Sequence, residues 1–120
     1  MSIDEFRKKA LMQDKRNVFE CCSGDISFVP IELQEFFKDC NPMDVEITMD
    51  GNAVRFYPLS DLIQLQEDYD LTDGRFVFAT CNSDPIYIFK NEIYTRCHGN
   101  SKSRDEKMAN SFVEFLELID

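Results

Sequence analysis

The stretch FVFATCNSDPIYIFKNEIYTR, residues 76–96, decides the fold of this chain. The unbroken apolar run within residues 75–80 predicts a strand that is buried on both faces. Asn, Ser, Asp and Pro at residues 82–85 predict a turn, because these residue types favour turn conformations. Two further strands are predicted over residues 86–89 and 92–96, with only a Lys-Asn pair between them. Three consecutive strands joined by short turns predict an antiparallel meander.

Upstream of this stretch the sequence predicts a hairpin. Apolar and polar residues alternate over residues 45–49 and again around Val54 and Phe56, as they do in half-buried strands. Asp50-Gly51 lies between the two runs and suits a two-residue turn, since both residue types tolerate positive φ. The hairpin and the meander together predict an antiparallel sheet of about five strands.

Helices are predicted on either side of these strands, from apolar residues at helical spacing. They cover residues 3–15, the segment from Pro30 to the stop signal Asn41-Pro42, a short segment from the N-cap Ser60 through Leu65, and residues 105–119. We predict an α+β fold in which N-terminal and C-terminal helices cover one side of the sheet. The apolar residues that mark these helices are Ile3, Phe6, Ala10, Ile31, Phe36, Phe37, Leu62, Ile63, Leu65, Met108, Phe112, Phe115, Leu116 and Ile119, and Ile31, Phe36 and Phe37 are predicted to share a buried face.

Length and composition are those of a small globular protein. The 120 residues predict a single domain over residues 1–120. A hydrophobic content of 43% argues against intrinsic disorder. The chain has no apolar run of about 18 residues, so we expect no membrane-spanning helix. Its first nine residues include five charged side chains and lack the apolar stretch of a secretory signal, so we expect a cytoplasmic location. We also expect a monomer.

Negative charge is concentrated in the middle of the chain. There are 13 Lys and Arg against 23 Asp and Glu, a net charge of −10. Residues 21–90 contain thirteen acidic and four basic side chains, so this segment alone has a net charge of −9. Such charge repels the phosphates of nucleic acids and anionic membranes, and it attracts a basic protein. We expect a protein partner and no direct binding to nucleic acid or membrane.

The sequence offers no organised catalytic or metal-binding motif. His98 is the only histidine, there is no nucleophile-elbow sequence, and the four glycines form no phosphate-binding loop. The cysteines are odd in number and lack C-x-x-C spacing, which predicts reduced thiols and neither a disulfide framework nor a zinc site. We expect no enzymatic activity and no cofactor. The five cysteines are Cys21, Cys22, Cys40, Cys81 and Cys97.

An acidic stretch over residues 61–84 is the predicted partner-binding surface. Only Arg75 opposes its carboxylates, whose mutual repulsion is a cost that folding alone does not require. We expect most of the stretch to be loop, with Tyr69 as an aromatic anchor among the carboxylates. A solvated face that serves only solubility is the alternative. The predicted partner-binding residues are Asp61, Glu67, Asp68, Tyr69, Asp70, Asp73 and Asp84.

Four segments, in order along the chain, resemble the SUKH superfamily, also called the SMI/KNR-like proteins. They are FVPIELQEFF at residues 28–37, FYPLSDL at 56–62, FVFATCNSDPIYI at 76–88 and ANSFVEFL at 109–116. The resemblance implies an α+β fold and a non-enzymatic role. Many bacterial members of the superfamily are similar to immunity proteins that bind and silence a cognate toxin, often a nuclease. The resemblance therefore implies an immunity protein with a basic toxin domain as its partner. Fungal members resemble regulatory scaffolds, and a cytosolic scaffold that binds other cellular proteins is the alternative.

Overall fold

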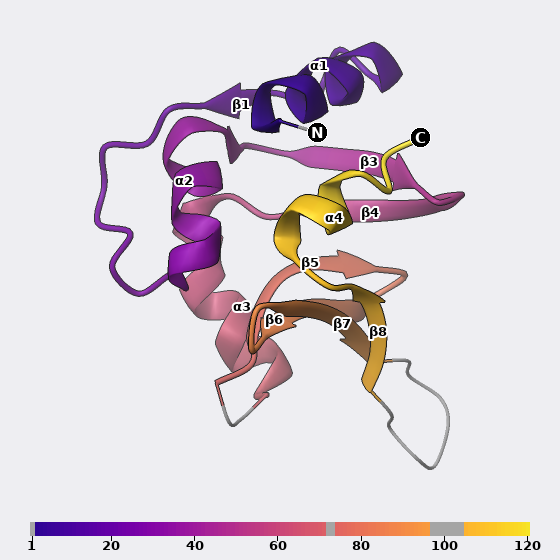
Figure 1. The fold of residues 1–120 in the computed structure, drawn as a ribbon. Coiled ribbons are helices and arrows are strands. Elements are labelled where there is room, and N and C mark those ends of the chain that lie inside the picture. Colours follow the sequence, from indigo (N-terminus) through magenta and orange to yellow (C-terminus); the bar gives the residue numbers. More distant parts are fainter. Residues whose placement is uncertain (1, 72–73, 97–104) are drawn as a thin grey trace.

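The computed structural model describes residues 2–71, 74–96 and 105–120, and these residues form the predicted α+β fold (Figure 1). The described residues contain four α-helices, a six-stranded sheet and a two-stranded sheet. In chain order the elements are α1 (Ile3–Gln13), β1 (Phe19–Glu20), α2 (Ile31–Asp39), β2 (Asn41–Pro42), β3 (Val45–Met49), β4 (Asn52–Phe56), the 3-10 turn η1 (Leu59–Asp61), α3 (Leu62–Tyr69), β5 (Phe76–Cys81), β6 (Asp84–Phe89), β7 (Glu92–Arg96), β8 (Asp105–Ala109) and α4 (Phe112–Leu116).

The large sheet is an antiparallel meander, as predicted. Its strands lie in the order β3-β4-β5-β6-β7-β8, and each neighbouring pair is antiparallel. Three of its connections are two-residue turns with positive φ at both central residues, namely Asp50-Gly51, Asn82-Ser83 and Lys90-Asn91. Positive φ at both positions is typical of type I′ turns, which match the twist of the flanking strands. The predicted Asp50-Gly51 hairpin is confirmed.

The predicted helix over residues 105–119 is wrong in its first half. Asp105–Ala109 forms β8, which pairs with β7, and only Phe112–Leu116 forms α4. The helix begins at the N-cap Ser111, whose hydroxyl accepts a hydrogen bond of 3.1 Å from the backbone N–H of Glu114. The edge of β7 offers unpaired backbone groups to β8, and this pairing outweighs the helical propensity of Glu, Lys, Met and Ala. The sheet therefore has six strands where about five were predicted.

A cluster of charged and aromatic side chains holds the start of β8. Asp105 accepts a hydrogen bond from the hydroxyl of Tyr87, and its carboxylate lies 3.1 Å from Arg75 Nη2 and 2.9 Å from Arg96 Nη2. Burial raises the pKa of Tyr87 to about 12, and its hydrogen bond to Asp105 acts in the same direction. Burial also raises the pKa of the Asp105 carboxyl, but the hydrogen bonds from its three donors outweigh burial and lower it below 3.8. The cluster thus links β8 to β6, to β7 and to the residue that precedes β5.

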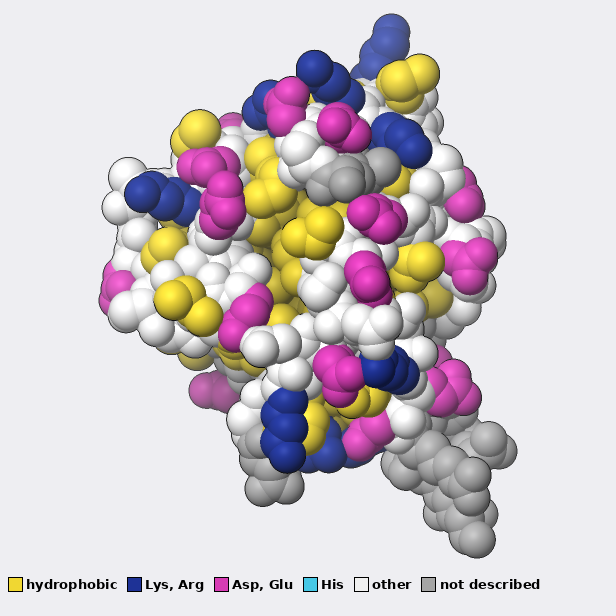
Figure 2. Space-filling model, in the orientation of Figure 1, with side chains coloured by type: hydrophobic (Ala, Val, Ile, Leu, Met, Phe, Trp, Pro, Cys, Tyr) yellow, Lys and Arg dark blue, Asp and Glu magenta, His cyan; other side chains and the backbone are white. Residues whose placement is uncertain are grey.

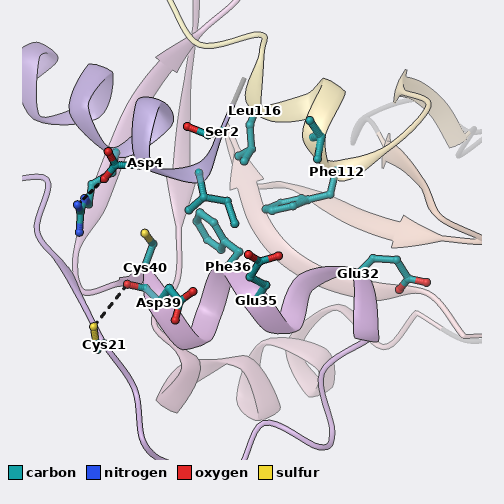
Figure 3. A pocket seen from close by; sticks show the side chains of 13 residues that line it. Ser2, Asp4, Cys21, Glu32, Glu35, Phe36, Asp39, Cys40, Phe112 and Leu116 are labelled. Atoms are coloured by element: carbon teal, nitrogen blue, oxygen red, sulfur yellow. Dashed lines mark hydrogen bonds and ion pairs between the residues drawn. The ribbon is translucent and has the colours of Figure 1, made fainter.

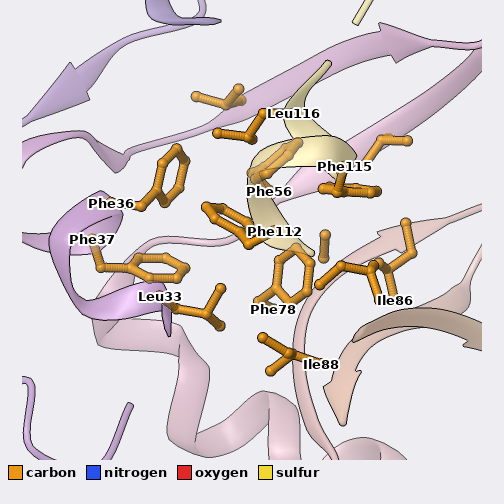
Figure 4. Close-up of a cluster of buried hydrophobic side chains, with 14 of the residues drawn as sticks. Leu33, Phe36, Phe37, Phe56, Phe78, Ile86, Ile88, Phe112, Phe115 and Leu116 are labelled. Atoms are coloured by element: carbon orange, nitrogen blue, oxygen red, sulfur yellow. The ribbon is translucent and has the colours of Figure 1, made fainter. Parts of the chain in front are cut away.

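A cluster of phenylalanine rings lies at the centre of the core, between the sheet and helices α1, α2 and α4 (Figure 4). The ring centroid of Phe56 on β4 lies 5.7 Å from that of Phe6 on α1 and 6.1 Å from that of Phe115 on α4. Phe78 on β5 lies 5.5 Å from Phe112 in an edge-to-face arrangement. Residues 77–80 of β5 are all buried, which confirms the prediction of a strand covered on both faces.

Two of the apolar residues that mark the predicted helices are exposed, and one of them, Ile31, was predicted to be buried. Ile31 is 77% exposed and Ile63 is 60% exposed. Each lies off the apolar stripe of its helix, because buried residues recur at spacings of three and four while these two fall between the repeats. The buried residues of α2 are Leu33, Phe36 and Phe37, and those of α3 are Leu62 and Leu65.

Amide side chains form hydrogen bonds with strand backbone groups that have no neighbouring strand. Gln13 of α1 accepts a hydrogen bond of 2.7 Å from the N–H of Thr48 and donates one of 2.9 Å to its carbonyl, so it occupies part of the outer edge of β3. At the point where β4 ends, Gln66 of α3 pairs with Val77 of β5 in the same way. Helix α3 therefore packs beside β5.

Candidate functional site

The acidic stretch that was predicted to bind a partner is distributed over α3 and the turn between β5 and β6. Glu67, Asp68 and Tyr69 form the last turn of α3, and Asp70 caps it in the left-handed conformation with φ 46°. The prediction that this part is mostly loop is wrong, because the helix continues through its acidic residues to Tyr69. Asp61 is the N-cap at the opposite end of α3, about 12 Å away along the helix axis.

Tyr69 links α3 to the turn between β5 and β6. Its hydroxyl donates a hydrogen bond of 2.7 Å to the carbonyl of Ser83, which precedes Asp84 at the start of β6. Burial raises the pKa of Tyr69, and neighbouring groups that include Asp84 and Asp68 raise it further. The structure thus brings Asp68, Tyr69 and Asp84 together, and the hydroxyl of Tyr69 is used to join two elements. Asp73 lies outside the described residues.

A second surface, which we call the helical groove, lies between α1, α2 and α4. The groove has a volume of about 650 Å³. Phe36 from α2 and Phe112 and Leu116 from α4 point into it and form an apolar floor (Figure 3). Val113, which is 51% exposed, adds apolar surface on the solvent side. Figure 2 shows this apolar hollow in the face of the molecule, with acidic side chains around it.

Carboxylates line the wall that α2 contributes to the helical groove. Glu32, Glu35 and Asp39 recur at spacings of three and four residues, so they share one face of the helix. All three are exposed, and none of their carboxylates has a hydrogen bond or ion pair with another residue of the described ranges. This wall therefore presents three uncompensated negative charges beside apolar surface.

The wall that α1 contributes differs, because its carboxylate is compensated within the helix. Asp4 lies 2.6 Å from Arg7 Nη2 and 3.2 Å from Lys8 Nζ. The hydrogen bond and the charge of Lys8, followed by those of Arg7, lower the pKa of Asp4. The asymmetry between the two walls makes α2 the side of the groove that attracts a cation.

Two thiols lie at the edge of the groove. Cys21 is exposed, with its Sγ 3.8 Å from the carbonyl oxygen of Asp39. Cys40 is buried, and burial raises the pKa of its thiol, which disfavours the reactive thiolate. Within the described residues, no group of three His, Cys, Asp or Glu side chains is arranged to hold a metal ion. Cys97 and His98 lie outside those residues.

Comparison of the chain with known protein families, curated proteins and solved structures gives no match. In the part of the chain that the structure describes, no helix combines the length and the apolar character needed to cross a membrane. An apolar hollow bordered by free carboxylates is suited to bind a basic, partly apolar ligand.

Sequence reasoning did not find the helical groove. Taken singly, Glu32, Glu35 and Asp39 are ordinary solvated residues of an amphipathic helix. The groove exists because α4 approaches α2, so that the ring centroids of Phe36 and Phe112 lie 5.1 Å apart although the residues are distant in sequence. The one local signal was the recurrence of three carboxylates on a single helix face.

Proposed function

We propose that this chain is a non-catalytic protein-binding module of the cytoplasm, an immunity protein that binds a basic toxin domain and neutralises it. The observation that carries the proposal is the helical groove, where exposed apolar surface lies beside three uncompensated carboxylates. Apolar area contributes affinity, and carboxylates select a basic partner. The similarity of four sequence segments to the SUKH superfamily supports the same function, and it supports a nuclease as the class of toxin.

Neutralisation of a nuclease follows from charge. A nuclease binds its substrate through Lys and Arg side chains that contact the phosphates. A protein with a net charge of −10 is attracted to such a surface and excludes nucleic acid from it. Electrostatic steering also accelerates association, which favours capture of a toxin before it reaches its substrate. The association rate should fall as salt screens the charges.

The experiment that tests this function starts from the neighbouring reading frame. We expect an upstream gene that ends in a small basic domain. Expression of that domain alone should stop growth, and co-expression of this chain should restore it. With purified proteins, the two should form a complex of fixed stoichiometry, and nuclease activity should disappear at one equivalent of this chain.

Three outcomes would contradict this function. A toxic basic domain that keeps full activity in an excess of this chain would exclude neutralisation. Weak binding to several unrelated cellular proteins would favour the regulatory scaffold. Loss of protection in both the His98→Ala and the Cys97→Ser variants, each at an unchanged melting temperature, would count against a pure binding role.

A further inference from the structure

We propose that the helical groove receives a basic, amphipathic α-helix of the partner protein. This inference rests on the proposed function, because it names the element of the partner that the groove binds. It follows from the shape of the groove, from the spacing of its charges and from the closure of nearby backbone edges.

The shape of the groove suits an inserted row of apolar side chains. Phe112 is 5% exposed and Leu116 is fully buried, so they support the groove from beneath and leave Val113 as the main apolar surface that a ligand can contact. Val113 is half exposed and stands at the mouth of the groove. A helix that lays its apolar stripe along such a trough removes this surface from water, as in other helix-in-groove complexes.

The spacing of the charges matches a helix. Glu32, Glu35 and Asp39 lie within eight residues of α2, and the seven residue steps from first to last correspond to about 10 Å or two helical turns. A partner helix that lies along α2 would place Lys or Arg at the same spacing of three and four residues on the flank of its apolar stripe. Each cation would then meet one uncompensated carboxylate.

Other occupants fit the groove less well. An extended strand would need unpaired backbone groups to pair with, but the walls are helices whose backbone groups are bonded internally. The outer edge of β3 is also occupied, because Gln13 and Asn17 bond to its backbone. A second copy of this chain and a nucleic acid both carry negative charge, which the α2 wall repels.

The experiment uses the full chain and two fluorescent peptides of Leu and Lys, each of about 18 residues so that a helix can form. The first peptide places Leu at helical spacing, and the second has the same composition in strict alternation, which favours a strand. Binding is measured by fluorescence anisotropy at low and high salt. Circular dichroism and melting temperature establish that each protein variant is folded.

Two triple variants carry the same change in net charge on different helices. The groove variant combines Glu32→Gln, Glu35→Gln and Asp39→Asn, and the matched control on α3 combines Glu67→Gln, Asp68→Asn and Asp70→Asn. The groove variant should bind the helical peptide about tenfold more weakly, and the α3 control should change affinity less than about threefold. Val113→Asp, at the mouth of the groove, should also weaken binding about tenfold or more.

Several results would overturn the inference. Equal weakening by the two triple variants would show that net charge alone drives binding. Equal affinity for the two peptides would show that the groove does not select a helix, and tighter binding of the alternating peptide would indicate an extended occupant. A dimer of this chain that dissociates in the groove variant would assign the groove to a second copy.

Failure of the inference and failure of the proposed function are distinguishable. If the groove variant still neutralises a toxin as well as the native chain does, the groove is not the docking site and the function stands. If the groove binds the helical peptide as described but the chain protects against no toxin, the function is wrong and the inference stands.

Discussion

Gln66 takes the place of a missing strand at the edge of β5, and its removal should destabilise the protein. The pairing of β4 with β5 ends at Phe56 and Ala79, so the backbone N–H and C=O of Val77 have no strand partner on that side. Gln66 accepts a hydrogen bond of 2.8 Å from the N–H of Val77 and donates one of 2.6 Å to its carbonyl. Val77 is fully buried, so water does not replace these bonds. The Gln66→Leu variant keeps the apolar body of the side chain and removes both hydrogen bonds.

The expected loss of stability follows from the two unsatisfied groups. A buried N–H without an acceptor costs about 1–3 kcal/mol, and a carbonyl costs somewhat less because it has two lone pairs. Together they predict a decrease of about 2–4 kcal/mol in the free energy of unfolding, out of a typical total of about 5–15 kcal/mol. The matched control is Gln64→Leu on the exposed side of α3, which should change stability by no more than about 0.5 kcal/mol.

Urea unfolding followed by circular dichroism measures both variants, and hydrogen exchange of the Val77 amide reports the local effect. A loss below about 0.5 kcal/mol in Gln66→Leu, or equal losses in Gln66→Leu and Gln64→Leu, would refute the reasoning. The Gln66→Glu variant tests the direction in which stability changes with pH. Its carboxylate can accept from the N–H of Val77 but cannot donate to the carbonyl, so protonation should be favoured and its folded pKa should be raised. The stability that this variant retains should therefore be largest at acid pH and should fall as pH rises.

The other predictions concern the core and the Asp105 cluster. Phe112→Ala should cost about 3–5 kcal/mol in urea unfolding, because its ring contacts Phe36 and Phe78, whereas a loss below about 1 kcal/mol would mean that the ring is not part of the core. Asp105→Asn should cost about 1–3 kcal/mol at neutral pH. The pKa of Asp105 in the folded chain is lowered below 3.8, so the native chain should be more stable than this variant above that pH. The difference in stability should disappear as pH falls further and the carboxylate is protonated. A difference that persists in acid would contradict the ion-pair argument. In an absorbance titration Tyr87 should ionise near pH 12, and the stability that its raised pKa contributes should be lost as pH rises from 10 through that value. The Asp105→Asn variant should lower the pH at which Tyr87 ionises.

The sequence was sufficient where structure is locally determined. The Asp50-Gly51 hairpin and the strand at the centre of the sheet follow from turn residues and from apolar runs only a few residues long. It was insufficient where a distant segment decides the outcome. Asp105–Ala109 has helical propensity, and it becomes a strand because β7 has an open edge and because two arginines and Tyr87 hold Asp105 there. These partners lie 9 to 30 residues away in sequence, beyond the reach of periodicity.

The binding surface shows the same limit in a sharper form, because charge alone does not distinguish recognition from solubility. On α3, Asp68 accepts a hydrogen bond of 3.0 Å from Gln64 and the hydroxyl of Tyr69 bonds to Ser83, so part of that surface serves the fold. On α2, the carboxylates of Glu32, Glu35 and Asp39 bond to no other described residue, and they border apolar surface that only the approach of α4 creates. Carboxylates beside apolar surface restrict which partner can cover it. The composition of the chain therefore indicates the charge of the partner, whereas the topology indicates the place where the partner binds.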